Sequence, residues 1–308
     1  MIFQNQSNGA GFCCNKACTA AKHSSYGNFP ILFQNECILI CMNSNTNIRG
    51  AQAKDASRIA EILVFSKRTH YRQIFQDDAF SFGELQVLAI AQDMLVRPKT
   101  LSAYSVYDDG FVKGLIQLKN DEIAELYIDP FFERQGIGSA LMAYALENIL
   151  LPRLWVLDGN DNAVRFYQKH GFRFTGEQTL VPGTDKTESR MIYNGPITGD
   201  LSQKTVRVTI DRPIGSAHPN YPDLIYPVNY GYVEGVPGGD GEDQDAYVFG
   251  IDKPITEMYG KIAAIIHRED DNEDKWVVVP DGVKVRTSDI IKNTAFQERY
   301  FKTSIIML

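Results

Sequence analysis

The stretch LYIDPFFERQGIGSALM, residues 126–142, decides the fold of the first half of the chain. Its first residues read as the end of a strand, its middle as a glycine-containing loop and its last residues as the start of a helix. Such a turn points several backbone N–H groups and the positive end of the helix at one place, where a pyrophosphate fits. Gly136 and Gly138 allow close approach of the backbone to that ligand, although a lone Gly-x-Gly is weak evidence by itself.

Around this loop, strands and helices alternate from Asn47 to about Tyr193. Helices are expected over residues 53–65, 84–95, 141–150 and 162–170, and strands over residues 101–106, 110–119, 122–129 and 154–157. Gly171 ends the last of these helices, because glycine is the usual residue just after a helix C-terminus. The pattern predicts an α+β or α/β body with a mixed central sheet.

A second stretch, NAVRFYQKHGF at residues 162–172, sharpens the interpretation of the glycine loop. Together the two stretches resemble the GNAT family of N-acetyltransferases, and the likeness covers residues 47–193. In that family a Q/R-x-x-G-x-G/A loop holds the pyrophosphate of coenzyme A, and the later stretch supplies an Asn near the pantetheine and a Tyr near the sulfur. Glu133 stands where the family prefers Gln or Arg, and the Asn–Ala spacing at Asn162 is tighter than usual.

The resemblance implies transfer of an acetyl group from acetyl-CoA to an amine, with the acceptor attacking the thioester directly. Tyr167 then matches the acid that protonates the leaving thiolate. Glu125, on the strand leading to the loop, is the candidate base, with a solvated strand residue as its alternative interpretation. The implied coenzyme contacts are Tyr127, Ile128, Arg134, Gln135, Gly136, Gly138, Ser139, Asn160 and Asn162.

The acceptor is not readable from the sequence. The region before Thr100 is expected to line its pocket, and residues 65–82 are rich in aromatic side chains with mixed charge. That composition allows a small amine, an amino acid or a protein N-terminus.

The polar stretch at residues 194–204 contains two Gly and one Pro and is the expected linker. Beyond it, short strands with Pro and Gly turns predict a small OB-like β-barrel, closed by a helix from Ser288 to about Phe301. Residues 205–308 carry 17 acidic against 11 basic side chains, nearly the whole excess of a chain with net charge −7.

This second half resembles the family I inorganic pyrophosphatases, on the run YPVNYGY at residues 226–232 and the acidic stretch that follows it. The resemblance implies hydrolysis of pyrophosphate with Mg²⁺. The implied metal ligands are Asp240, Asp245, Glu273 and Asp274. Glu242 matches the residue that helps to activate water, and Tyr230, Lys275 and Tyr300 match phosphate contacts.

Several departures keep a second hypothesis open for this half. Only nine residues separate Ser216 from Tyr226, where the family has a hairpin that brings cations to the phosphates. Phe301 replaces a phosphate-binding Lys, and Lys302 lies one position late, turned away by about 100° on a helix. The alternative is a non-catalytic module that binds a metal or a phosphorylated ligand, or mediates assembly.

The overall composition excludes several classes of protein. The chain is 44% hydrophobic and 22% charged, contains no apolar run long enough to span a membrane, and has no evident basic patch for nucleic acid.

All five Cys precede Met42, which fits a reducing cytoplasm for the rest of the chain. Residues 1–41 are interpreted as a disordered or spurious leader, with a zinc knuckle of Cys14, Cys18, Cys37 and Cys41 as the alternative. The partners expected are the amine acceptor, pyrophosphate and a second copy of the chain.

Overall fold

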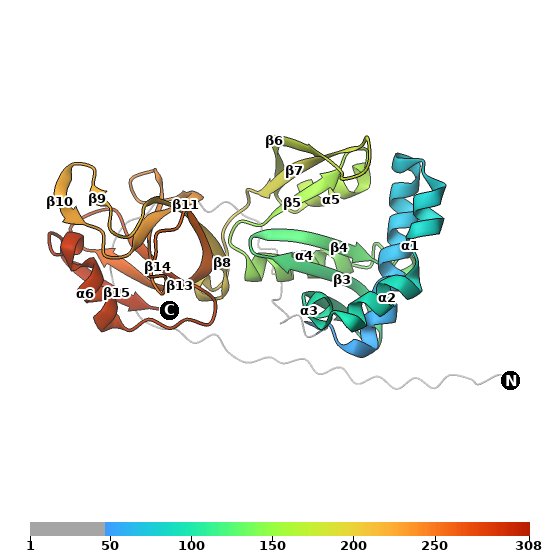
Figure 1. Ribbon diagram of the computed structural model, residues 1–308, viewed down its shortest axis with the longest axis horizontal. Helices are drawn as coiled ribbons and strands as arrows, with labels where there is room; N and C mark the ends of the chain where they lie inside the picture. Colours follow the sequence, from blue (N-terminus) through green and yellow to red (C-terminus); the bar gives the residue numbers. More distant parts are fainter. Residues whose placement is uncertain (1–46) are drawn as a thin grey trace, which may run out of the picture. The chain divides into compact units, whose positions relative to one another are not determined.

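The structure, a computed structural model, describes residues 47–308 (Figure 1). The first 46 residues, which include all five Cys of the leader, lie outside the described part. The described residues form two β-sheet systems. A seven-stranded sheet precedes residue 194, and a six-stranded sheet begins at Thr205.

The seven-stranded sheet has the order β1-β2-β3-β4-β5-β7-β6. Its strands are β1 (Ile48–Gly50), β2 (Tyr104–Asp108), β3 (Val112–Lys119), β4 (Glu122–Ile128), β5 (Arg153–Leu157), β6 (Phe172–Leu180) and β7 (Thr187–Tyr193). All neighbours are antiparallel except β4 and β5, which run parallel. The sheet is therefore mixed, as the sequence predicted.

The centre of this sheet is interrupted at one place. β4 and β5 pair only at Glu122 and Arg153, so the two strands part beyond that point. On its other side, β4 carries a register shift: Gln117 faces Glu125, whereas the next residue, Leu118, faces Ile123. Such a bulge reverses the faces of the residues that follow it. Because β4 and β5 pair only at Glu122 and Arg153, the second half of β4 has a free edge on the side of β5.

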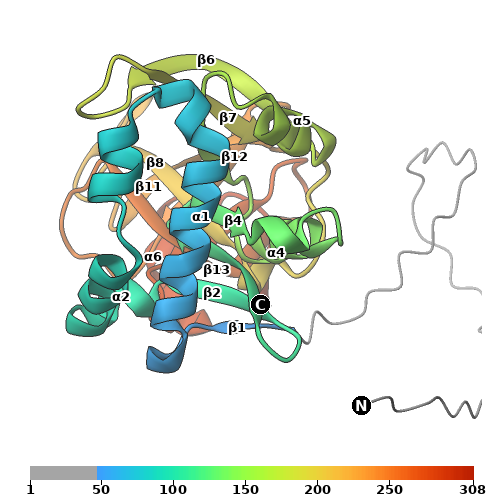
Figure 2. The same ribbon diagram turned by 90° about the vertical axis from the view of Figure 1, so that its right-hand side faces the viewer.

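Helices cover both faces of the sheet (Figure 2). They are α1 (Ala56–Phe75), α2 (Val87–Val96), α3 (Pro98–Ser102), α4 (Ile137–Asn148) and α5 (Asp161–Lys169). The first three helices pack with Leu115 of β3, whereas α4 and α5 pack with Ile116, the next residue, on the opposite face. Alternation along β3 thus divides the hydrophobic core into two layers.

The helices α1 and α4 differ most from the boundaries expected from sequence, and α3 contains the first residues of the strand expected over residues 101–106. α1 runs ten residues past Phe65, because its second half (KRTHYRQIF) has no continuous apolar stripe that periodicity would detect. The helix α4 begins at Ile137, earlier than the expected residue 141, because the glycine loop leads directly into it.

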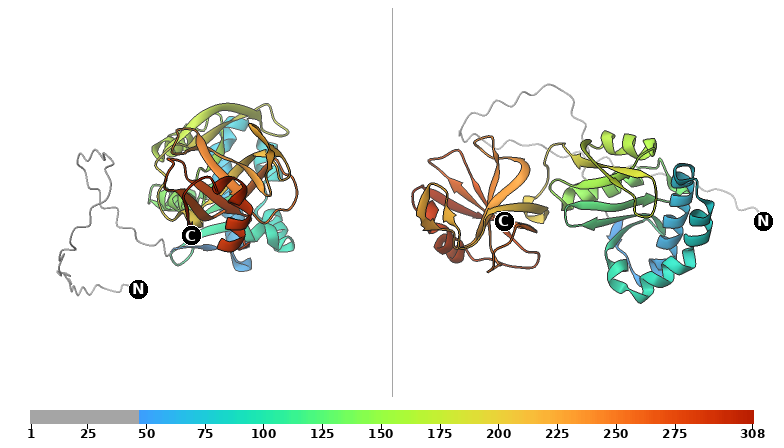
Figure 3. Two further views of the ribbon diagram at one scale, coloured as in Figure 1. Left: turned by 90° about the vertical axis from the view of Figure 1, so that its left-hand side faces the viewer. Right: turned by 45° about the horizontal axis from the view of Figure 1, so that its top comes forward.

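The second system is a closed barrel of five strands: β8 (Thr205–Arg212), β11 (Asn229–Pro237), β12 (Asp243–Val248), β13 (Glu257–Arg268) and β14 (Lys275–Val279). Pairing of β13 with both β8 and β14 closes the ring (Figure 3). The short strands β9 (Ala217–His218) and β10 (Tyr221–Ile225) form a separate hairpin. A barrel was expected, and its OB-like identity stays a prediction.

The end of the chain corrects the sequence analysis. The helix α6 (Thr287–Glu298) was expected to close the chain, but β15 (Thr303–Met307) follows it and pairs antiparallel with β13. The polar residues 302–304 hide this strand, because they break the apolar alternation that would have predicted it.

The stretch before β8 is anchored in the structure. Lys204, expected within the linker, is buried, and its ammonium donates to the carbonyl of Leu146 in α4. Leu150 packs with the apolar residues of the barrel core. The domain boundaries at residues 194 and 204 stay a prediction. In the described part, no helix is long and apolar enough to cross a membrane.

Candidate active site

The glycine loop has the backbone geometry of an anion cradle. Gly136 adopts φ +87° and forms the N-cap of α4, and Arg134 adopts φ +60°, a region that residues with a side chain rarely occupy. Left-handed residues next to a helix start turn successive N–H groups toward one concavity, which suits an anion. At Gly138 a Cβ atom would lie 3.2 Å from the ring of Phe166, so a larger residue there requires that ring to shift.

A cavity of about 610 Å³ opens at this loop. Eight of the nine expected coenzyme residues line it, together with Tyr167: Tyr127, Ile128, Arg134, Gly136, Gly138, Ser139, Asn160 and Asn162. Gln135 does not line the cavity; its amide donates to the carbonyl of Phe131 at 3.4 Å. The cavity therefore combines the loop, the end of β4 and the start of α5.

The start of α5 is fixed by Asn160. Its side-chain oxygen accepts from the backbone N–H of Ala163 at 3.3 Å, which caps the helix. The oxygen is thus occupied, while the residue still lines the cavity. Asn162 accepts from the guanidinium of Arg165 at 2.7 Å.

Helix α1 supplies one wall that the motifs did not identify. His70 and Glu133 lie 2.8 Å apart between Nε2 and Oε1, and the hydroxyls of Tyr71 and Tyr127 lie 3.2 Å apart. The first pair explains why Glu133 is tolerated in the loop, because a histidine faces its carboxylate. The signal for this wall was the aromatic composition of residues 65–82, but the partners lie 63 and 56 positions away in sequence.

Tyr167 lines the cavity, and its hydroxyl has no hydrogen-bond partner among residues 47–308. Burial raises the pKa of Tyr167, with a smaller contribution from Tyr71. A tyrosine whose pKa is raised keeps its proton throughout the neutral range and can donate it.

Glu125 lies near the cavity without lining it. It accepts from the Tyr104 hydroxyl at 2.5 Å and forms an ion pair with Lys67 at 3.6 Å. Lys67 also lies 5.5 Å from the centre of the Tyr127 ring. These contacts hold the carboxylate between Tyr104 of β2 and Lys67 of α1.

In the barrel, three of the expected site residues converge on a buried ammonium. Lys275, whose side chain is 2% exposed, contacts Asp245 and lies 2.5 Å from Glu273. Tyr230 donates to Asp245 at 2.6 Å. Burial opposes ionisation of Asp245, but hydrogen bonding from Glu273 and the charge of Lys275 hold its pKa below the usual range. Burial and the neighbouring Asp245 raise the pKa of Glu273.

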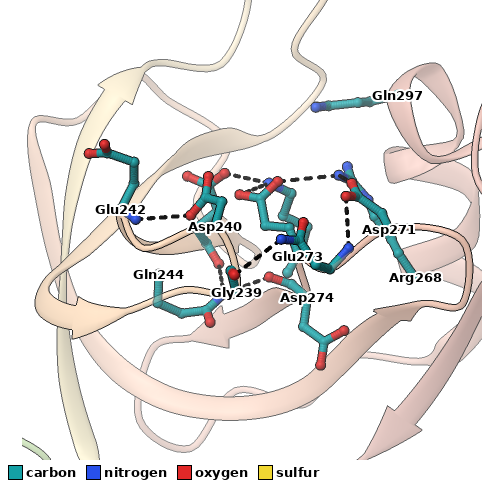
Figure 4. A network of polar contacts seen from close by, with 12 residues as sticks. Gly239, Asp240, Glu242, Gln244, Arg268, Asp271, Glu273, Asp274 and Gln297 are labelled. Carbon is teal, nitrogen blue, oxygen red and sulfur yellow. Dashed lines mark hydrogen bonds and ion pairs between the residues drawn. The ribbon is translucent and has the colours of Figure 1, made fainter.

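A second buried cation continues this network. Arg268, 3% exposed, binds Glu298 at 2.9 Å, Asp271 at 3.0 Å and Glu273 at 3.4 Å. Its guanidinium also lies 3.7 Å from the centre of the ring of Phe301, the residue that replaces a family Lys. Lys275 and Arg268 thus pair with the carboxylates of this network, in which Figure 4 labels Arg268, Asp271 and Glu273.

The remaining expected barrel residues lie apart from Lys275. Glu242 is exposed and points away from Glu273, and Asp240 accepts from the backbone N–H of Glu242 at 3.0 Å (Figure 4). Asp274 pairs with His267 at 2.7 Å. Tyr300 is exposed and accepts from Arg299 at 2.8 Å.

The fit of these residues to Mg²⁺ is poor. Within residues 47–308 no three His, Cys, Asp or Glu side chains are placed to share one ion. Hard cations need several free carboxylate oxygens, whereas Asp245 and Glu273 are held by Lys275 and the latter also by Arg268.

Comparisons with known proteins bear on the first half of the chain. A family model described as "Acetyltransferase (GNAT) domain" matches residues 100–174. The chain is 31% identical over 136 residues to the peptidyl-lysine N-acetyltransferase YjaB of Salmonella typhimurium, which covers 44% of this chain and 88% of the relative. It is 32% identical over 81 residues to the uncharacterized N-acetyltransferase MJ1207 of Methanocaldococcus jannaschii, covering 25% of this chain and 34% of the relative.

Among solved structures, apo-YjaB from Escherichia coli matches with 20% identity and a TM-score of 0.38, covering 48% of this chain and 97% of the other. The PaiA N-acetyltransferase of Thermoplasma acidophilum, in complex with coenzyme A, matches with 21% identity and a TM-score of 0.38, covering 48% and 98%. The glycine loop and the relation to YjaB agree: the chain belongs to the GNAT family of N-acetyltransferases.

Proposed function

We propose that this chain transfers the acetyl group of acetyl-CoA to a primary amine at the cavity beside β4. The observation that carries the proposal is the convergence of eight expected coenzyme residues and Tyr167 on one cavity. The backbone amides of the loop and the start of α4 bind the pyrophosphate, and the free edge of β4 receives the amide-bearing arm of the coenzyme.

The chemistry follows from the placement of two side chains. Glu125 takes a proton from the acceptor ammonium, directly or through a water, so that the neutral amine attacks the thioester carbon. The C–S bond breaks as the C–N bond forms, and the leaving thiolate takes the proton of Tyr167. The acylated nitrogen loses its second proton, which restores Tyr167, and Glu125 releases the proton that it took to solvent. The products are the acetylated amine and coenzyme A.

We further propose a peptidyl lysine as the acceptor. The support is the peptidyl-lysine activity of the YjaB relative and the cavity wall to which α1 contributes His70 and Tyr71. The acceptors that the sequence composition allows, a small amine, an amino acid or a protein N-terminus, are the competing substrates for the test.

The experiment is release of coenzyme A from acetyl-CoA by the full chain, with lysine-containing peptides, N-terminal peptides blocked at lysine, and small amines as acceptors. Thioester cleavage that depends on a free lysine side chain supports the proposal. Cleavage with small amines alone contradicts the acceptor, and no cleavage with any amine contradicts the activity.

For the barrel we propose the non-catalytic alternative over hydrolysis of pyrophosphate. The specific observation is that Lys275 and Arg268 occupy the carboxylates that a magnesium ion would need. The test is phosphate release from pyrophosphate by the full chain with Mg²⁺, against Asp245→Asn. Turnover that is lost in the variant would establish a hydrolase and overturn this proposal.

A further inference from the structure

Behind the glycine loop, a histidine contacts a serine at the start of α4. This serine lies in the cavity wall and is the one residue at the start of α4 that carries a hydroxyl group. Ser139 is the third residue of α4, and its Oγ lies 3.1 Å from Nε2 of His170, the residue that ends α5. Ser139 lines the cavity, whereas His170 stands behind it. None of the sequence motifs assigned a role to His170.

The surroundings hold this imidazole in place. The ring of Phe166 packs against it with 4.6 Å between centroids, and that same phenyl ring lies against Gly138 of the loop. The backbone N–H of His170 bonds to the carbonyls of Phe166 and Tyr167 at the end of α5. The end of α5 and the start of α4 therefore meet at the Ser139–His170 hydrogen bond.

The direction of this bond decides what Ser139 offers to a ligand. When Nε2 accepts from the hydroxyl, Ser139 presents only lone pairs to the cavity, and these repel a phosphate oxygen. When Nε2 carries a proton, it donates to Oγ, and the hydroxyl hydrogen is free for the ligand. A protonated imidazole secures this second arrangement and adds a positive charge one side chain away from the anion.

We propose that His170 is a positioning residue for the coenzyme: it orients the Ser139 hydroxyl toward the pyrophosphate and takes up a proton when the coenzyme binds. The inference rests on the proposed function, because it takes the cavity to be the coenzyme site. In the free chain, burial and the neighbouring Lys169 lower the pKa of His170, so the imidazole is neutral at pH 7 and able to gain a proton.

The charged groups around His170 are few among the described residues. Lys169 on α5 acts on it directly, and Ser139 is its contact from α4. In the preceding loop, Glu133 and Arg134 line the cavity, and Glu133 is engaged by His70. His70 is the one other imidazole at the described cavity wall. The test must therefore distinguish proton uptake by His170 from proton uptake by His70.

The experiment is calorimetric titration of the full chain with dephospho-coenzyme A, which lacks the 3′-phosphate that would itself titrate near pH 6. Titrations at pH 6.5 in buffers of different ionisation enthalpy give the number of protons taken up. We expect net proton uptake by the wild type, and an affinity about tenfold higher at pH 5.5 than at pH 8, for a pKa raised by about one unit on binding.

Two matched variants assign the proton. His170→Gln keeps an N–H donor for Ser139 without a titrating group, so we expect binding to persist with no proton uptake and a flat pH profile. His70→Gln should retain the uptake. His170→Asn repeats the measurement should the first variant fold poorly.

The outcomes are distinct. Uptake that survives in His170→Gln, or that disappears in His70→Gln instead, overturns the role of His170 while the coenzyme site stands. No binding of the nucleotide to the wild type at any pH overturns the proposed function and this inference together.

Discussion

The hydroxyl of Tyr104 on β2 donates to the Glu125 carboxylate on β4 at 2.5 Å, across the intervening strand β3. Burial and the charge of Glu125 raise the pKa of Tyr104, so this tyrosine remains a donor at every pH at which the enzyme would act. With Lys67 on the other side at 3.6 Å, the carboxylate is held in position between two partners.

Glu125→Gln should lower kcat by about 100-fold, because it removes the group that takes the proton of the amine. The affinity for the coenzyme should not change. The measurement is initial rate against pH with a lysine peptide. Glu122→Gln on the same strand is the matched control, because Glu122 pairs with Arg190 at 3.8 Å instead of with the site. An equal loss in both variants would remove Glu125 from the mechanism.

Tyr167→Phe should lower kcat by about 10- to 100-fold and leave the KM for acetyl-CoA nearly unchanged, because the proton is needed only by the leaving thiolate. Because burial raises the pKa of Tyr167, the wild-type rate should show no fall from loss of this proton below about pH 10. Tyr193→Phe serves as control, since its hydroxyl donates to the carbonyl of Pro196. A rise in KM at constant kcat would show that Tyr167 only binds substrate.

Two glycine substitutions should separate binding from backbone strain. At Gly138 a methyl group would lie 3.2 Å from the ring of Phe166, so Gly138→Ala should narrow the cradle and weaken coenzyme binding more than tenfold. At Gly136 nothing lies within 4 Å, but φ is +87°. Gly136→Ala should therefore cost about 1 kcal/mol of stability and affect binding less. Thermal unfolding with and without coenzyme A measures both, and the reverse order would contradict the cradle geometry.

Lys275→Met should destabilise the barrel by about 3 kcal/mol at pH 7, because it leaves Asp245 as a partly buried carboxylate without its cation and leaves Glu273 with Arg268 alone. In the wild type, the lowered pKa of Asp245 contributes stability that is present above its unfolded value of about 3.9 and lost as pH falls through the folded value. In the variant Asp245 lacks its cation and resists ionisation, so the deficit in stability should shrink as pH falls toward 4.

Urea unfolding at pH 7 and pH 4.5 measures this difference, with the exposed Lys284→Met as the matched control. A deficit of the same size at both pH values would show that Lys275 acts through packing alone.

The sequence predicted the order of elements better than their partners. The strands expected over residues 110–119 and 122–129 correspond to β3 and β4, and the helix expected to end before Gly171 is α5. By contrast, the approach of His70 to Glu133 joins residues 63 positions apart, and no local propensity encodes it. The loop could be predicted because it recognises its ligand through backbone amides, whose placement a short motif determines.

The barrel illustrates the opposite case. Asp240, Glu242 and Asp274 are close in sequence to Asp245 and Glu273, which contact Lys275. Their own side chains nevertheless lie apart from Lys275. A carboxylate run has the same appearance in a solvated turn as in an ion site. Only the fold shows that buried cations of the chain itself, Lys275 and Arg268, are placed among the carboxylates.

Because β4 and β5 separate after the pair Glu122 and Arg153, the sheet consists of two parts that are joined over a short length. Amide hydrogens on the unpaired edge of β4 should exchange with solvent quickly, although they lie in the middle of a seven-stranded sheet. A ligand whose amides bond to that edge would serve as the absent strand and slow this exchange. Occupancy would then be readable from the backbone amides of Leu126 and Ile128, which face that edge, without any assay of turnover.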